Sequence, residues 1–241
     1  MSAPPGPEIQ AMFGEIAPRY DFLNRLLSFG IDRSWRRRAV RRAVSSPGGR
    51  VLDLCCGTGD LALELAAAGA EVHGADFTGP MLVRAHEKAA APKRKGAAPA
   101  WVRADAMALP YADASFDAVT IAFGIRNVVD PRAALAECRR VLRPGGSLLV
   151  LEFFPIRNRL WKAVFGFYFA KVLPLLARVV RAGRTGAYTY LPASVEEFAQ
   201  VEEFRGWMEE AGLDEVEDRP LTGGVARLVV GRAGPPAGAP A

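Results

Sequence analysis

Short apolar runs alternate with helical stretches through the middle of this chain. Five runs are expected to form buried strands: Arg50–Leu54, Glu71–Ala75, Ala100–Arg103, Ala118–Ala122 and Gly146–Glu152. Helices are expected between them, at Asp60–Ala68, Pro80–Ala91 and Pro131–Leu142. Such an alternation predicts a parallel sheet with helices on both faces, and ligands bind at the carboxyl ends of its strands.

The pattern changes on both sides of this region. Residues 8–44 predict two or three helices with a turn near Ser28-Phe29-Gly30, which we interpret as an N-terminal helical lid. A basic, aromatic-rich insertion at 153–194 follows the fifth strand, and one helix, Val195–Ala211, is expected to restore the pattern.

The last two apolar runs, Glu215–Leu221 and Ala226–Arg232, flank a Thr-Gly-Gly turn as the strands of an antiparallel hairpin would. We therefore predict an α/β fold, with a doubly wound, mostly parallel seven-stranded sheet and an antiparallel edge hairpin. The main domain is expected at 45–233. The Pro/Gly/Ala-rich ends, 1–7 and 234–241, are expected to be disordered.

Composition places the chain among ordinary globular proteins. Half of its 241 residues are hydrophobic and 24% are charged, unlike a disordered sequence. The three cysteines, Cys55, Cys56 and Cys138, cannot build a disulfide framework, and no His/Cys cluster has zinc-ligand spacing. The N-terminus does not resemble a signal peptide, and charges and a proline interrupt the best membrane-span candidate, Leu160–Val180. These features predict a cytoplasmic protein without a metal.

Positive charge gathers in two places. The stretch Phe153–Val195 has seven Lys and Arg and no Asp or Glu, which exceeds the net charge of +5 of the whole chain. A second cluster near the N-terminus consists of Arg33, Arg36, Arg37, Arg38, Arg41 and Arg42. Basic patches suit nucleic acid or an anionic membrane surface, and the alternative is a solvated face of an arginine-rich protein.

The strongest local motif is VLDLCCGTGD, residues 51–60, in which a strand leads into glycines and the start of a helix. Glycines let the backbone approach a ligand closely. The spacing Gly57-x-Gly59-x-x-Ala62 also fits a dinucleotide fold, so the glycines alone leave a dehydrogenase open.

Three acidic residues decide whether the ligand of this motif is a dinucleotide. Asp53, inside the strand before the glycines, would repel a pyrophosphate but attract a ligand that carries an ammonium and a sulfonium. Asp76 ends the second strand, where a carboxylate accepts hydrogen bonds from ribose hydroxyls, and Asp105 follows the third, where it can meet an adenine amino group. Any one of them could instead cap a helix. Together they resemble the class I S-adenosylmethionine-dependent methyltransferases over residues 45–152.

Further stretches resemble one branch of that superfamily, the ubiquinone/menaquinone biosynthesis C-methyltransferases. They cover almost the whole chain: Tyr20-Asp21-Phe22-Leu23-Asn24, Ser28-x-Gly30, Trp35, Phe123-Gly124-Ile125-Arg126-Asn127, Arg140 to Gly146 with Leu151-Glu152, Tyr188-x-Tyr190-Leu191-Pro192-x-Ser194 and Leu221-Thr222-Gly223-Gly224. Asp32, Ala122 and Phe154 depart from the pattern, because the family usually has His, Ser and Ser there.

The resemblance implies transfer of a methyl group from S-adenosyl-L-methionine to a ring carbon of a polyprenylated quinol, by default demethylmenaquinol, with S-adenosyl-L-homocysteine as product. No catalytic metal is expected, because the sulfonium is already activated. The expected cofactor-binding residues are Asp53, Gly57, Thr58, Gly59, Asp76, Phe77, Asp105 and Ala106. The expected catalytic residues are Arg126, Asn127 and Tyr20, and the expected quinol-binding residues are Tyr20, Asn24 and Tyr190.

Structural roles stay open for several of these residues. Tyr20, Asn24 and Ser28, spaced by four, would share a helix face that either meets the acceptor or packs the lid. Arg126 could hold a developing phenolate, orient a water base or form a structural salt bridge. The cysteines of the glycine motif are expected to be packing residues rather than nucleophiles.

The alternative function is methyl transfer to another phenolic or lipid-like small molecule. Because a polyprenyl tail stays in the bilayer, we expect the insertion 153–194 to dock on anionic lipid at the inner face of the cytoplasmic membrane. Its aromatic residues could instead face inward and cover the sheet edge. No nucleic-acid partner is expected, and the oligomeric state stays open, with a homodimer as one alternative.

Overall fold

The computed structural model describes residues 6–17, 20–44, 48–92, 95–156, 161, 166 and 187–234. Most of the predicted insertion 153–194 lies outside these residues, and so do the predicted disordered ends 1–7 and 234–241 apart from 6, 7 and 234.

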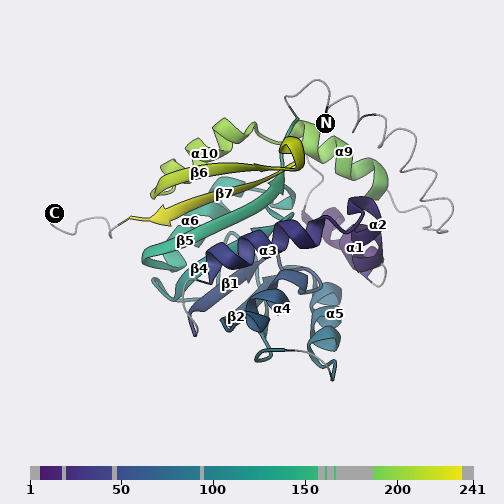
Figure 1. Ribbon diagram of the computed structural model, residues 1–241, viewed down its shortest axis with the longest axis horizontal. Helices are drawn as coiled ribbons and strands as arrows, with labels where there is room; N and C mark the ends of the chain where they lie inside the picture. The colour runs from purple at the N-terminus through teal and green to yellow at the C-terminus, as the bar shows by residue number, and fades with distance from the viewer. Residues whose placement is uncertain are drawn as a thin grey trace.

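Seven strands form one sheet in the order β3-β2-β1-β4-β5-β7-β6 (Figure 1). Their bounds are Arg50–Leu54 (β1), Glu71–Asp76 (β2), Ala100–Arg103 (β3), Phe116–Ala122 (β4), Leu142–Phe153 (β5), Leu213–Leu221 (β6) and Ala226–Ala233 (β7). The first five strands pair in parallel, whereas β7 runs antiparallel to both β5 and β6. The predicted sheet with its antiparallel edge hairpin is confirmed.

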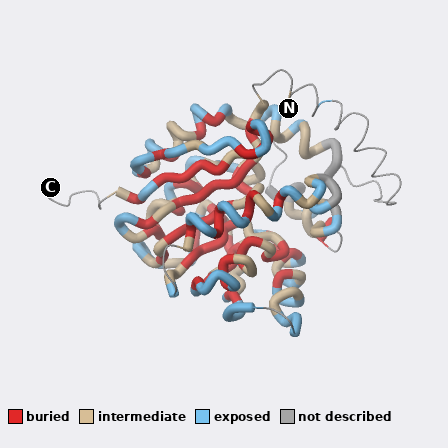
Figure 2. The backbone as a smooth tube through the Cα atoms, in the orientation of Figure 1, coloured by how far each residue is buried: buried red, intermediate tan, exposed pale blue. Residues whose placement is uncertain are grey.

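Helices cover both faces of the sheet, as a doubly wound fold requires. One face packs against α3 (Asp32–Ala43) and α4 (Asp60–Ala67), and the other against α6 (Pro131–Val141) and α10 (Val201–Glu210). Alternate residues of each strand enter the two cores, so the buried positions concentrate in the strands (Figure 2). Helix α5 (Gly79–Ala89) packs on β2 and β3 at the edge of the sheet.

The N-terminal residues form three helices, α1 (Gly6–Ile16), α2 (Tyr20–Ser28) and α3. The turn between α2 and α3 is stabilised by Asp32, whose carboxylate accepts hydrogen bonds from Ser28 Oγ at 2.7 Å and Arg36 Nη1 at 2.6 Å. This buried pair accounts for an aspartate where the family pattern has a histidine.

The predicted single helix Val195–Ala211 is wrong, because two helices occupy this region. Helix α9 (Ala187–Glu197) ends inside the predicted span, and α10 starts after Gln200, whose backbone is extended. The break lets the ring of Phe198 pack between Phe154 and Trp207. Burial of these aromatic rings outweighs the helix propensity of the sequence. It also places Phe154, a departure from the family pattern, in the core.

No helix in the part of the chain that the structure describes is both long and apolar enough to cross a membrane.

Candidate active site

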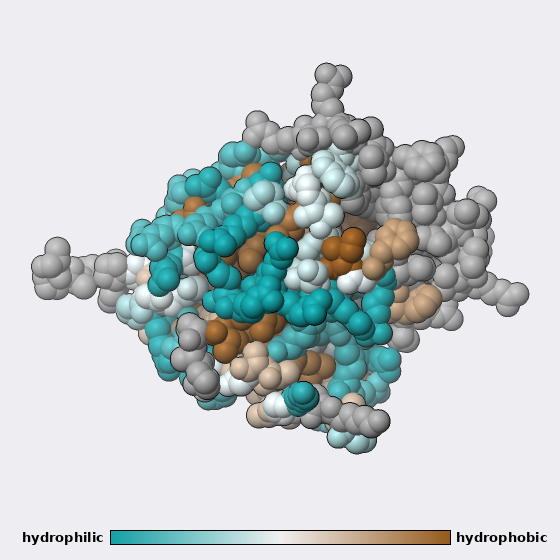
Figure 3. Space-filling model, viewed as in Figure 1, coloured by the Kyte–Doolittle hydropathy of each residue, from teal (hydrophilic) through white to brown (hydrophobic). Residues whose placement is uncertain are grey.

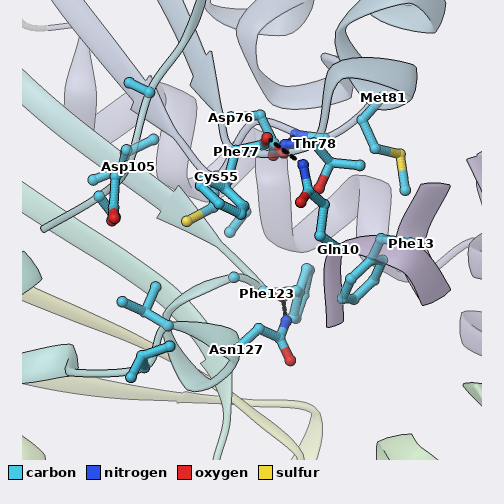
Figure 4. A pocket seen from close by; sticks show the side chains of 18 of the residues that line it. Gln10, Phe13, Cys55, Asp76, Phe77, Thr78, Met81, Asp105, Phe123 and Asn127 are labelled. Atoms are coloured by element: carbon cyan, nitrogen blue, oxygen red, sulfur yellow. Dashed lines mark hydrogen bonds between the residues drawn. The ribbon is translucent and has the colours of Figure 1, made fainter. Parts of the chain in front are cut away.

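A pocket lies at the carboxyl ends of the parallel strands, where the sheet topology predicts a ligand site (Figure 4). It brings together seven of the residues predicted from the sequence: Tyr20, Gly57, Asp76, Phe77, Asp105, Ala106 and Asn127. The other predicted residues are described but lie outside the pocket lining: Asn24, Asp53, Thr58, Gly59, Arg126 and Tyr190.

Asp76 is held in place by the backbone at the end of β2. Its Oδ2 accepts a hydrogen bond from the Gly57 amide, and its Oδ1 accepts one from the Thr78 amide, both at 2.8 Å. Burial raises the pKa of the carboxyl above its usual value, and the two amides counteract part of that rise. The Thr78 side chain also hydrogen-bonds this carboxyl. Because a carboxylate can accept about four hydrogen bonds, it keeps acceptor capacity for a ligand hydroxyl.

The glycine motif forms a tight turn between β1 and α4. Gly59 has φ of 79°, and an added Cβ would lie 2.5 Å from the Trp101 ring, so a side chain is excluded there. Cys55 adopts a left-handed φ of 56°, which is strained for a residue with a side chain. Gly124 approaches it so closely that an added Cβ would lie 2.4 Å from the Cys55 Cβ. Burial raises the pKa of the Cys55 thiol well above its usual value, as expected for a packing residue.

Asp53 lies beneath this turn, on the α4 side of the sheet. Its Oδ1 accepts a hydrogen bond from Thr120 Oγ1 at 2.8 Å, while Oδ2 has no partner among the described residues. Burial raises the pKa of this carboxyl to about 7. The carboxylate therefore underlies the glycine turn rather than the pocket wall.

Asp105 and Phe77 continue the pocket on the β2–β3 side. Asp105 follows β3 in a short turn, in which its Oδ1 accepts a hydrogen bond from the Met107 amide at 2.9 Å. Phe77 is 44% exposed and offers an apolar ring beside it. A flat aromatic base fits such a combination of a carboxylate and an apolar surface.

Helices α1 and α2 close the other side of the pocket. Gln10 Nε2 donates a hydrogen bond to the Phe77 carbonyl at 3.3 Å, and Phe13 packs edge-on against Tyr20. Burial raises the pKa of the Tyr20 hydroxyl, and a hydrogen bond with Asn24 counteracts it. Tyr20 and Asn24 thus share one helix face, as their spacing predicts.

A tyrosine and a backbone carbonyl hold the Asn127 side chain at the pocket floor. Asn127 lies in a short 3-10 turn, Ile125–Asn127, after β4. Its Oδ1 accepts a hydrogen bond from Tyr190 Oη at 2.8 Å, and its Nδ2 donates to the Phe123 carbonyl at 3.4 Å. Tyr190 comes from α9, so the region after β5 reaches back to the pocket.

Arg126 lies behind this floor in a buried ion pair with Glu152, the last but one residue of β5. Its Nη1 donates to Glu152 Oε1 and to the Phe123 carbonyl, and its Nε donates to Ser194 Oγ at 3.3 Å. The structural salt bridge that the sequence leaves open is therefore present.

A network of charges ties the lid to the glycine turn. Lys88 Nζ, on α5, donates to Asp21 on α2 at 2.8 Å, to Thr58 Oγ1 at 3.1 Å, and to Asp60. Thr58 Oγ1 in turn donates to Asp21. Burial acts to raise the pKa of Asp60, but Lys88 and Arg36 together lower it below its usual value.

Sequence reasoning missed most of the lid and floor of the pocket. Neither Gln10 nor Phe13 has a local signal, because only tertiary packing brings α1 against α5 and the end of β2. Glu152 had one, since it is the single charge in the apolar run LLVLEFF, residues 148–154. Among the described residues, no group of three or more His, Cys, Asp or Glu side chains could hold a metal ion.

Solved structures with the same fold include methyltransferases. The [4+2]-cyclase SpnF superposes with a TM-score of 0.67 at 20% identity, over 97% of this chain and 98% of that one. A SAM-dependent methyltransferase from Aquifex aeolicus gives a TM-score of 0.64 at 18% identity, over 91% of this chain and 98% of that one. At such identities the likeness concerns the fold alone.

Curated relatives are much more similar in sequence. The demethylmenaquinone methyltransferase of Thermus thermophilus is 53% identical over 222 residues, 91% of this chain and 99% of that protein. The ubiquinone/menaquinone biosynthesis C-methyltransferase UbiE of Geobacter sulfurreducens is 47% identical over 232 residues, 95% of this chain and 90% of that protein. The model of the ubiE/COQ5 methyltransferase family matches residues 5–232. This chain therefore belongs to the ubiE/COQ5 methyltransferase family.

Proposed function

We propose that this chain transfers a methyl group from S-adenosyl-L-methionine to a ring carbon of a polyprenylated quinol, with demethylmenaquinol as the first substrate to test. The observation that carries the proposal is a pocket with two chemically different sides. Carboxylates line the sheet side, at Asp76 and Asp105, and an aromatic ring and an amide line the other, at Phe13 and Asn127 (Figure 4). Tyr20 also lines the pocket and packs against Phe13. The names of the relatives support the same activity.

The sheet side fits the cofactor. The Asp76 carboxylate keeps acceptor capacity for a ribose hydroxyl, and Phe77 and Ala106 offer apolar surface to an adenine. Gly57 leaves room at the pocket wall, since the nearest atom to an added Cβ is 3.9 Å away on Tyr20. When bound, S-adenosyl-L-methionine supplies a methyl group activated by the positive sulfur.

The lid side fits a phenolic ring. A ring carbon is a poor nucleophile until the neighbouring hydroxyl loses its proton, so this side must accept that proton or stabilise the phenolate. Tyr20 and Asn127 present a hydroxyl and an amide at the wall, and Tyr190 is hydrogen-bonded to that amide. Arg126 places a buried positive charge behind them. Alignment of the ring with the methyl group supplies much of the remaining rate.

We also propose that the chain collects its substrate at an anionic membrane surface, as a peripheral protein of the inner face of the cytoplasmic membrane. The insertion 153–194, where the sequence places this contact, lies largely outside the described residues. Support within them comes from α3, whose outer face exposes Arg33, Arg37 and Arg41. Figure 3 shows a hydrophilic band where α3 crosses this face, with hydrophobic side chains beside it near α2.

Quinone analysis tests the function. A strain that lacks its own demethylmenaquinone methyltransferase is complemented with this chain, and its quinones are identified by mass spectrometry. We expect menaquinone to replace demethylmenaquinone. If demethylmenaquinone persists although the purified chain binds S-adenosyl-L-homocysteine, the acceptor is another phenolic or lipid-like molecule.

A further inference from the structure

Glu152 is a charged side chain in the interior, and the pocket lining does not include it. It is fully buried at the carboxyl end of β5, between the apolar neighbours Leu151 and Phe153. Its Oε1 accepts hydrogen bonds from Arg126 Nη1 and from the Phe153 amide at 2.8 Å. Its Oε2 has no hydrogen-bond partner among the described residues. Burying such a charge is costly, so its presence here calls for a role.

A chain of hydrogen bonds leads from this carboxylate to the pocket floor. Arg126, held by Glu152, donates to the Phe123 carbonyl, and Asn127 Nδ2 donates to the same carbonyl. Tyr190 Oη then donates to Asn127 Oδ1. The Phe123 carbonyl is therefore the point at which the buried ion pair meets residues that line the pocket.

The backbone of Phe123 is strained, and its neighbours fix its conformation. Its φ of 58° is left-handed, which costs a residue with a side chain of order 1–3 kcal/mol unless its surroundings fix it. The ring is clamped by Phe153, at 4.6 Å between centroids, and by Trp35, at 6.1 Å. The Arg126 guanidinium holds the carbonyl of the same residue. Ring and carbonyl contacts together hold the strained turn that carries Asn127.

The charges of Arg126 and Glu152 also affect the hydroxyls of Tyr20 and Tyr190. Burial raises the pKa of Tyr20 and of Tyr190, and in each case Arg126 lowers it while Glu152 raises it. Because Arg126 and Glu152 act in opposite directions, their effects on the electrostatic potential at Tyr20 and Tyr190 partly cancel. Removing only one of them would upset this balance.

We propose that Glu152 is a positioning residue for the quinol side of the reaction: through Arg126 and the Phe123 carbonyl it fixes the Asn127 amide and the Tyr190 hydroxyl at the pocket floor. This inference rests on the proposed function only in the identity of the acceptor. Glu152 itself touches neither substrate, and its effect passes through Arg126.

The test compares Glu152→Gln with the double variant Arg126→Gln/Glu152→Gln, which removes both buried charges and so avoids an unpaired one. Asp117→Asn is the matched control. Asp117 also pairs with an arginine and a backbone amide, but it lies at the opposite end of β4. For each variant we measure kcat and KM for demethylmenaquinol, the affinity for S-adenosyl-L-homocysteine, and hydrogen exchange of residues 123–127.

We expect Glu152→Gln to lower kcat/KM for the quinol by roughly 10- to 100-fold, as misplaced substrate-positioning groups do. The affinity for S-adenosyl-L-homocysteine should stay within threefold of the wild type, and exchange at 123–127 should rise. In the double variant, the loss of kcat/KM should be no larger than in Glu152→Gln alone, because both residues act in one chain. Asp117→Asn should change none of these values.

Wild-type kcat/KM for the quinol in Glu152→Gln, or equal losses of quinol turnover and cofactor affinity, would overturn the proposal. So would unchanged exchange at residues 123–127 in a folded Glu152→Gln protein. If the wild type itself does not methylate the quinol, the proposed function fails, and hydrogen exchange still decides the role of Glu152.

Discussion

Two backbone amides and the Thr78 side chain fix the carboxylate of Asp76, for which we propose a role in binding the ribose. The Gly57 and Thr78 amides bind the two oxygens of Asp76 and orient it before any ligand arrives. Asp53 has the opposite environment, since it is buried beneath the same turn and lacks a partner for one oxygen among the described residues. Asp76 therefore bears on cofactor binding and Asp53 on the pH dependence of stability, and each supports a separate prediction.

Asp76→Ala should weaken binding of S-adenosyl-L-homocysteine more than other single changes outside the glycine turn. Hydrogen bonds to a charged group contribute about 1.5–3 kcal/mol, which corresponds to roughly 10- to 150-fold in affinity. Calorimetric titration measures the loss, with Asp113→Asn, an exposed carboxylate paired to Arg140, as the control. A loss of less than threefold in a folded variant would remove Asp76 from the cofactor site.

Asp53 should make stability depend on pH. Because folding raises its pKa from 3.8 to about 7, the folded state favours the protonated carboxyl. The resulting stabilisation is fully present below pH 3.8 and is lost as the pH rises through about 7. The free energy of unfolding of the wild type, relative to Asp53→Asn, should thus fall by roughly 2–3 kcal/mol between pH 5 and pH 7.5. Urea denaturation at both pH values measures it, and a difference that does not change with pH would contradict the assignment.

At the scale of elements, the lid is attached to the cofactor side by charge. Lys88 on α5 is the common partner of Asp21 on the lid and Asp60 at the start of α4. These side chains are about one quarter exposed, so salt only partly screens them. The position of α2 and the geometry of the glycine turn are consequently coupled.

Lys88→Met should therefore weaken binding of S-adenosyl-L-homocysteine and loosen α2 together. We expect a threefold to tenfold loss of affinity, equivalent to about 0.7–1.4 kcal/mol, with faster hydrogen exchange at residues 20–28. Arg84→Met, which removes an exposed pair with Glu87 on the same helix, is the matched control. Equal effects of the two variants would show that the lid is not coupled through Lys88.

The sequence predicts strands better than it predicts the lid. The bounds of β1 and β3 match the apolar runs. β1 is buried on both faces, and such a strand leaves a continuous apolar signal. Asp76 could be placed in the pocket for the same reason, since it marks the end of such a run. The break at residues 198–200 could not be predicted, because Phe198 leaves the helix to meet the aromatic rings of Phe154, just after β5, and Phe204, on α10.

At the scale of the whole molecule, apolar side chains lie exposed next to the arginine face. Phe22, Phe29 and Ile31 are 52%, 69% and 40% exposed, at α2 and the turn into α3. Soluble proteins seldom expose such rings beside a basic helix face, and interfacial proteins often do. These exposed side chains support an orientation in which α2 and the outer face of α3 meet a membrane.

Charge reversal of Arg33, Arg37 and Arg41 to Glu should abolish binding to anionic liposomes. Each cation near such a surface contributes about 1 kcal/mol, so losing three attractive charges should lower the affinity by roughly 100-fold or more. Sedimentation with vesicles of acidic and of neutral phospholipid measures binding at low and high salt. Arg219→Glu/Arg232→Glu, which changes exposed residues on β6 and β7, is the control. If both variants and the wild type sediment equally with anionic vesicles, the arginine face of α3 is not the membrane-binding surface.

Two hydrogen bonds join the first helices of the chain to its last hairpin. Trp35 Nε1 donates to Thr222 Oγ1 at 2.9 Å across 187 positions of sequence, and Arg42 donates to Glu217 at 2.9 Å across 175. During synthesis α3 leaves the ribosome well before residues 213–233, which form this hairpin. The ring of Trp35 also contacts Phe123, on the turn that carries Asn127. The pocket floor therefore lacks these contacts until residues 213–233 have been synthesised, so a nascent chain has no finished acceptor site before this hairpin forms.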